Sequence, residues 1–272
     1  KVLQEELAAG HPVDVAIDCL GGEVMGQCLE SLRHGARWIV IAALAGQYTS
    51  IDLKNIYKRN VKIIGSHAGL EPGQDGGTHQ AIADIALMRS LPNMTVLVPA
   101  DATTTHWMVR EAAAYDGPVY LRLGRLAAPV LYADNHEFKW GKGEIVRMGK
   151  DIVVFACGMM VSIALEAAEL LAAEGISVAV ADIHTIKPLD TDFILEMTER
   201  CGAAISLEEH NIIGGLGSAI AETLAGNSAA PFMRCGVEDK FGQSGSPEAL
   251  LKHYGLDAET TAMKIKQVLA RK

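Results

Sequence analysis

Short apolar runs alternate with helical patterns along the chain. Most of the runs are continuously apolar, which is typical of strands covered on both faces of a sheet. The alternation of such runs with helices predicts βαβ units and parallel sheets. The predicted strands are Val13–Asp18, Arg37–Ala42, Val61–Ile64, Thr95–Val98, Val119–Leu123, Ile152–Ala156, Ser177–Ala181 and Ala203–Glu208.

Helical patterns fill the intervals between these runs. The clearest covers Ser162–Ala173, whose apolar residues share one face while Glu166 and Glu169 face water, and Gly175 follows as a C-cap. We therefore expect an α/β protein with two three-layer α/β/α domains and mostly parallel sheets. The predicted helices are Gly22–Leu32, Gln80–Arg89, Thr104–Tyr115, Val161–Ala173, Thr191–Arg200, Ser218–Leu224 and Pro247–Tyr254.

A domain boundary is predicted within Arg125–Lys142, where Pro, Asn, Asp, Lys and Gly occur without a helical or strand period. Residues 61–125 then form the main part of the first domain, and residues 1–60 complete its sheet. Residues 126–142 form a linker, and residues 143–272 form the second domain.

Composition excludes several classes of partner. The 272 residues contain 24 Lys and Arg against 33 Asp and Glu, and no basic run is present, so nucleic acid is not expected as a partner. No apolar stretch reaches the roughly 18 residues of a membrane span, and the N-terminus does not resemble a signal peptide. The five cysteines lack a CxxC pair, which favours buried thiols in the cytoplasm.

The glycine-rich segment from residue 65 to residue 80 is the strongest candidate site. It follows a predicted buried strand and precedes a helix, so it lies at the carboxyl edge of a parallel sheet, where α/β proteins bind ligands. His67, Asp75 and His79 can converge there and suit a phosphorylated polyol, because imidazole donates to oxygen atoms and a carboxylate accepts from a hydroxyl. The alternative is a surface turn with solvated side chains, and spacing alone does not decide between them.

Several motifs then occur in a known order. His67-Ala-Gly-Leu, Asp75-Gly-Gly-Thr-His79-Gln and Arg89-Ser-Leu-Pro-Asn-Met resemble the pyrimidine-binding domain of transketolases, most closely the two-subunit bacterial and archaeal type. The resemblance continues from Val61 to the C-terminus. Its later segments are Val98–Asp101, Gly117–Arg125, His184–Asp190, Glu208–Ser218 and Phe241–Gly245.

The resemblance assigns roles to particular residues. It implies that His67 and His79 act in catalysis and bind substrate, that Arg125 binds the substrate phosphate, and that Asp75 binds a sugar hydroxyl. A guanidinium offers phosphate a planar fork, although an exposed cation at a strand end is the alternative for Arg125. The family implies a sugar-phosphate substrate, thiamine diphosphate with Mg²⁺ as cofactor, a homodimer and an N-terminal transketolase subunit as a possible partner.

The second domain is expected to be structural. The turn Gly214–Ser218 could offer backbone N–H groups to an anion, but a tight connection between strand and helix is the favoured interpretation. Glu208, Glu209 and His210 are interpreted as polar groups of packing and interface. The resemblance implies that this domain holds the dimer together.

Residues 1–60 resemble a different family. Val13–Gly22, Leu32–Ile41 and Val61–Ser66 resemble the end of the nucleotide-binding domain of medium-chain quinone oxidoreductases. The glutamate that activates thiamine diphosphate in transketolases has no counterpart there, and Glu23 and Glu30 belong to a helix of different ancestry. The chain is therefore interpreted as a chimera joined near Val61, and we expect weak cofactor binding or none by this chain alone.

Three functions follow from these features. The favoured one is a transketolase-like C-terminal subunit for ketol transfer between sugar phosphates, inactive by itself. The second is a non-catalytic α/β scaffold that keeps a sugar-phosphate pocket. The third, supported only by residues 1–60, is a fragment of an NAD(P)H-dependent quinone reductase.

Overall fold

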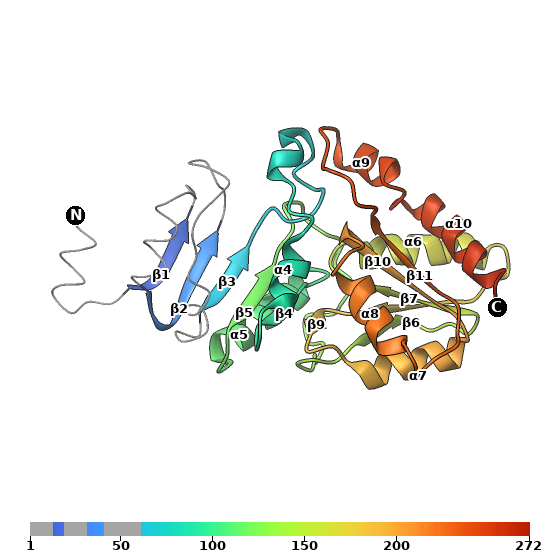
Figure 1. The fold of residues 1–272 in the computed structure, drawn as a ribbon, viewed down its shortest axis with the longest axis horizontal. Helices are drawn as coiled ribbons and strands as arrows, with labels where there is room; N and C mark the ends of the chain where they lie inside the picture. The colour runs from blue at the N-terminus through green and yellow to red at the C-terminus, as the bar shows by residue number, and fades with distance from the viewer. Residues whose placement is uncertain (1–12, 19–31, 41–60) are drawn as a thin grey trace.

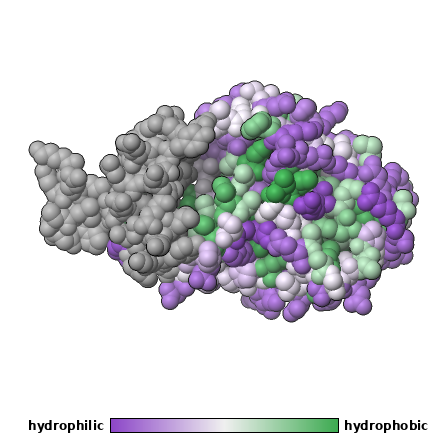
Figure 2. Space-filling model, viewed as in Figure 1, coloured by the Kyte–Doolittle hydropathy of each residue, from purple (hydrophilic) through white to green (hydrophobic). Residues whose placement is uncertain are grey.

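The fold was described from a computed structural model covering residues 13–18, 32–40 and 61–272. The predicted helix Gly22–Leu32 lies outside this part of the chain except for Leu32, which is the first residue of a strand. Within the described residues, no helix is both long and apolar enough to cross a membrane. On the face shown in Figure 2, hydrophilic and hydrophobic residues are interspersed.

The first sheet contains six strands in the order β1-β2-β3-β5-β4-β9. All neighbours are parallel except β4 and β9, which are antiparallel. Alternate residues point to opposite faces, so Ile63 and Tyr120 share a core with Ile85 of helix α4, whereas Leu121 packs with Met108 of α5. The elements are β1 (Val13–Asp18), β2 (Leu32–Val40), β3 (Lys62–Gly65), β4 (Thr95–Leu97), β5 (Val119–Arg122), β9 (Thr185–Lys187), α4 (Asp84–Ser90) and α5 (Ala102–Ala114).

The second sheet contains five strands in the order β11-β10-β7-β8-β6, with β6 antiparallel at one edge. Helices α6 and α10 pack on one face and α7 and α8 on the other (Figure 1). Two mostly parallel sheets flanked by helices confirm the predicted fold class. The elements are β6 (Glu144–Arg147), β7 (Ile152–Ala156), β8 (Val178–Asp182), β10 (Ala204–Asn211), β11 (Phe232–Val237), α6 (Met160–Ala172), α7 (Thr191–Cys201), α8 (Leu216–Leu224), α9 (Pro247–His253) and α10 (Ala258–Leu269).

The structure corrects several predicted boundaries. Helix α4 begins at Asp84 rather than at Gln80, because the Gln80 side chain exchanges hydrogen bonds with the backbone of Gln243. Strand β2 begins at Leu32 rather than at Arg37. The sequence prediction also missed helix α10 and the strands β6, β9 and β11.

The two sheets are joined more closely than a linker would join them. Strand β9 comes from the second half of the sequence but pairs with β4 of the first sheet. Residues 126–142 contain no helix or strand, yet Tyr132 and Phe138 are buried. The ring of Phe138 lies 5.3 Å from that of Trp107 on α5, and Tyr132 Oη donates to Asp182 of β8 at 2.9 Å. The predicted linker is therefore packed against both domains.

Lys187 connects β9 to the end of helix α4. Its Nζ donates to the carbonyl oxygens of Arg89 at 2.8 Å and of Leu91 at 2.5 Å. A helix leaves its last carbonyl groups without partners inside the helix, so the ammonium group of Lys187 acts as a cap supplied by the other half of the chain.

Replacing Lys187 with Met should lower the free energy of unfolding by about 1–3 kcal/mol, because both carbonyl oxygens lose a charged donor. Urea unfolding followed by circular dichroism measures this change. Lys266→Met is the matched control. Among the described residues, the side chain of Lys266 makes only an exposed ion pair with Glu174, so this change should alter stability by less than about 0.5 kcal/mol. Equal unfolding midpoints for the two variants would contradict the assigned cap.

Candidate functional site

The glycine-rich segment forms a closed loop at the carboxyl end of β3. It contains two short 3₁₀ turns, Gly73–Asp75 and Gly77–His79. Its base is fastened where the N–H of Ala68 donates to Leu123 O at 3.1 Å and the N–H of Gly69 donates to Ala81 O at 2.8 Å. The loop therefore starts and ends at one point of the sheet edge, as its position after a buried strand predicts.

Asp75 and Arg125 meet across this loop. Their side chains form an ion pair, and both are partly exposed. The carboxylate of Glu71 accepts from the backbone N–H groups of Arg125 and Leu126, which holds the chain in place directly after β5. Among the described residues, only Nη1 of Arg125 is engaged, so Nε and Nη2 remain available to a ligand.

The two histidines lie on the same loop without joining this pair. His67 is half-buried with a φ of 64°, and its Nδ1 lies 3.0 Å from Ser66 Oγ. This left-handed conformation is uncommon for a residue with a side chain and is found where surrounding contacts enforce it. His79 is exposed, with Nδ1 3.1 Å from Thr78 Oγ1. The structure thus brings Asp75 and Arg125 into contact and presents each imidazole separately.

A segment of the second domain, residues 241–245, supports the loop from the side. The amide group of Gln80 donates to Gln243 O at 2.8 Å and accepts from Gln243 N at 3.1 Å. A Cβ atom at Gly77 would lie 2.4 Å from the carbonyl oxygen of Gly242, so only glycine allows this approach. The motif Phe241–Gly245 therefore acts as packing for the loop that carries His79.

Behind the loop lies a buried ionic cluster that the sequence analysis did not identify. Arg122 is 6% exposed, and its Nε pairs with Asp84 Oδ2 at 2.8 Å. Its Nη2 donates to the carbonyl oxygens of Glu209 at 3.0 Å and of Ala81 at 3.2 Å. Tyr120 Oη donates to the same Asp84 oxygen at 2.7 Å. The sequence feature that could have indicated this cluster is an arginine within an otherwise apolar strand.

Burial and opposite charges compete in this cluster. Burial alone would lower the pKa of Arg122, but the carboxylates of Asp84 and Glu209 outweigh burial and raise it. Burial would likewise raise the pKa of Asp84, but Arg122 and His210 keep it below its ordinary value. Burial dominates for Glu209, whose pKa rises to about 8 despite the nearby Arg122.

The turn at Gly214–Ser218 is already occupied by a carboxylate of the chain. Glu208 accepts from the N–H groups of Leu216 at 2.7 Å and of Gly217 at 2.8 Å, at the first turn of α8. The pKa of Glu208 rises to about 7 because of burial, which these two N–H groups partly oppose. The structure therefore agrees with the packing interpretation of Glu208, Glu209 and His210, all of which are buried.

Three family models match the chain. The transketolase C-terminal domain matches residues 141–260, and the transketolase pyrimidine-binding domain matches residues 48–130. The zinc-binding dehydrogenase model matches residues 3–83, which fits a second ancestry for the front of the chain. The described residues of that front segment are β1 and β2, and the rest of residues 1–60, with Glu23 and Glu30, lies outside the described part.

Similar proteins point the same way. A putative transketolase C-terminal section from Methanocaldococcus jannaschii is 42% identical over 79% of this chain and 68% of that protein. A 6-deoxy-6-sulfo-D-fructose transketolase subunit from Clostridium sp. is 40% identical over 78% of this chain and 66% of that protein. A solved structure described as a split gene transketolase, inactive beta4 tetramer, superposes with a TM-score of 0.77 at 34% identity, covering 98% of this chain and 95% of the other.

Replacing Asp84 with Asn should destabilise the protein by about 3–5 kcal/mol, because the buried guanidinium of Arg122 would lose its main counter-charge. Urea unfolding measures the loss. The double variant Asp84→Asn with Arg122→Met should recover part of it, since the buried guanidinium is then removed together with its main counter-charge. Glu222→Gln breaks the exposed ion pair with Arg89 and serves as the control, with an expected change below about 1 kcal/mol. A loss no larger than that of the control would show that Asp84 does not compensate Arg122.

Proposed function

The chain belongs to the transketolase family, and we propose that it is the C-terminal subunit of a two-subunit transketolase that transfers a ketol group between sugar phosphates. The proposal is carried by the loop at the end of β3, where His67, Asp75 and His79 share a rigid base and Arg125 contacts Asp75. It is supported by relatives whose names describe transketolase subunits or a C-terminal section.

In this proposal the ion pair opens to receive substrate. The Nε and Nη2 atoms of Arg125 bind the phosphate as a fork, while Asp75 exchanges its contact with Arg125 for a sugar hydroxyl. The two groups keep each other in place in the free protein, so binding does not start from disordered side chains.

His67 and His79 are the proposed acid–base groups. An imidazole can accept a proton from a sugar oxygen at its unprotonated nitrogen and return that proton from the imidazolium form. His67 lies near the loop base with its Nδ1 atom 3.0 Å from Ser66 Oγ, whereas His79 lies exposed at the second 3₁₀ turn. These two positions place one imidazole at each end of the loop.

The proposal does not place thiamine diphosphate at this loop. The carboxylates beside the loop are engaged, because Asp75 pairs with Arg125 and Glu71 accepts from two backbone N–H groups. The sequence of residues 1–60 supplies no counterpart of the activating glutamate. The proposal therefore gives the cofactor and Mg²⁺ to an N-terminal transketolase subunit.

Assembly and location are further parts of the proposal. A homodimer in the cytoplasm is the expected form of the chain, with the N-terminal subunit as its catalytic partner. The solved relative described as an inactive tetramer offers a related case in which one kind of chain assembles without activity. The scaffold and the quinone reductase fragment remain as alternative functions, the latter favoured only by the dehydrogenase match at residues 3–83.

The chain with thiamine diphosphate and Mg²⁺ should show no ketol transfer, and adding a purified N-terminal transketolase subunit should restore it. A coupled assay with pentose phosphates measures the rate. His79→Ala should lower the restored kcat by about 10²-fold or more, because a positioned acid–base group is lost. His253→Ala, at the end of α9, is the control and should keep the rate. Transfer by the chain alone would refute the assignment of the cofactor to a partner, and full activity of His79→Ala would refute the role of His79.

The isolated chain should bind a pentose phosphate with a dissociation constant of about 1 mM, since a small polar ligand in a partial site gains only a few kcal/mol. Arg125→Ala should weaken binding about tenfold. Asp75→Asn should weaken binding of the sugar phosphate but not of inorganic phosphate. The guanidinium of Arg125 keeps its charge and is no longer paired with Asp75, so it can still bind phosphate. NMR titration separates these cases. Unchanged affinity in Arg125→Ala would rule out the phosphate role.

A further inference from the structure

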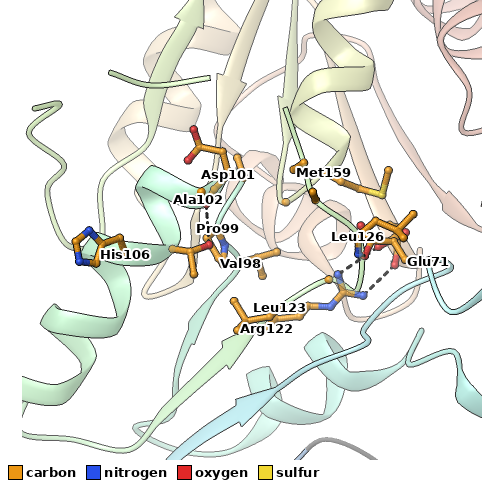
Figure 3. Close-up of a pocket in the computed structure, with 17 residues that line it drawn as sticks. Glu71, Val98, Pro99, Asp101, Ala102, His106, Arg122, Leu123, Leu126 and Met159 are labelled. Atoms are coloured by element: carbon orange, nitrogen blue, oxygen red, sulfur yellow. Dashed lines mark hydrogen bonds and ion pairs between the residues drawn. The ribbon is translucent and has the colours of Figure 1, made fainter. Parts of the chain in front are cut away.

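A cavity lies between the two domains, beside the glycine-rich loop. Its volume is about 420 Å³, within the range of small-molecule sites. Its walls come from the segment after β4, the segment after β5 and the start of α6. Glu71 and the guanidinium of Arg122 lie at one end and His106 at the other (Figure 3). The apolar lining includes Val98, Pro99, Leu123, Leu126 and Met159.

Most polar groups that line this cavity already have partners. Asp101 accepts from the N–H groups of Thr104, Leu131 and Tyr132. Arg122 is paired with Asp84, and Glu71 accepts from backbone N–H groups. Each of these three residues therefore has partners within the chain.

Glu209 is different. It lines the cavity, is 4% exposed, and its Oε2 atom has no hydrogen-bond partner among the residues that the structure describes. The other oxygen, Oε1, forms an ion pair with Arg122 Nη1 at 3.8 Å, and the Leu70 N–H also donates to this carboxylate. Burying a carboxyl oxygen without a hydrogen-bond partner costs free energy. A ligand that brings a donor to this oxygen removes that cost.

We propose that this cavity binds a small aliphatic compound with a primary ammonium group, which donates to Oε2 of Glu209. Its hydrocarbon part lies along Leu123, Leu126 and Met159. The lining does not include His67, Asp75, His79 or Arg125, the residues proposed to bind the sugar phosphate.

The balance of charge selects an ammonium group over an anion. The positive charge of Arg122 is already compensated by Asp84, while Glu71 and Asp101 add carboxylates to the lining. An anion would meet these two carboxylates, and the guanidinium in the lining already has Asp84 as its counter-charge. A cation gains from them and from the low polarity of the surroundings.

Binding should also release a proton. Burial raises the pKa of Glu209 to about 8, with Glu71 and Asp84 adding to the rise and Arg122 and the Leu70 N–H opposing it. The empty protein therefore holds Glu209 neutral near pH 7, and an ammonium ligand favours its ionised form. The number of protons released per bound ligand should be close to one at about pH 7. It should fall to zero above about pH 9, where Glu209 is already ionised.

Calorimetry of the full chain with n-butylammonium chloride tests this site. Titrations near pH 7 in two buffers of different ionisation enthalpy should give a dissociation constant of about 1 mM and show proton release. Glu209→Gln should weaken binding tenfold or more. This variant imitates the neutral carboxyl group, so its fold should be retained. Glu174→Gln, an exposed position, should leave binding unchanged.

Two further measurements test whether n-butylammonium binds in this cavity and through its charge. Met159→Trp fills the cavity without touching Glu209 and should also abolish binding. Neutral n-butanol should bind at least tenfold more weakly than n-butylammonium. Binding of n-butylammonium that survives both Glu209→Gln and Met159→Trp would overturn the proposal, and so would equal affinity for n-butanol. Neither result bears on transketolase activity, so the two proposals fail separately.

Discussion

The buried charge of Arg122 is the constraint on which the arrangement of this molecule depends. A guanidinium does not lose its proton in a protein, so strand β5 can carry it inward only if acceptors gather around it. They come from three separate segments: Asp84 at the start of α4, Ala81 at the end of the glycine-rich loop, and Glu209 on β10. One side chain therefore fixes the exit of the loop, the start of the next helix and the position of the second sheet.

This dependence explains which parts of the fold could be predicted from the sequence. Strands such as Ile152–Ala156 are apolar throughout and buried on both faces, so their pattern is a local property. Strands β6 and β9 lie at sheet edges and pair antiparallel with residues distant in the sequence, so no local pattern marks them. Helix α4 was predicted to begin too early because its true start depends on the contact of Gln80 with Gln243.

The candidate site shows the same division. The glycines and histidines of the loop stand in a short stretch of sequence and could be recognised together. The contact between Asp75 and Arg125 joins residues fifty positions apart, and it was expected only in the sense that both were assigned to one substrate. Arg122 was not predicted to be functional or structural, because the partners that stabilise a buried arginine lie far away in the sequence.

Strand β9 has a consequence for which segments of this chain could be exchanged for those of another protein. Strands β1 and β2 join the first sheet through a parallel backbone ladder, in which Trp38 pairs with Ile63 and Ile39 with Ile64, and through the buried side chains of Leu32 and Ala36. A crossover within residues 126–142 is different, because an exchanged second half would also replace the strand beside β4 and the ammonium group that caps α4. Exchange of the front of this chain therefore replaces fewer contacts between the two sheets than exchange of its back.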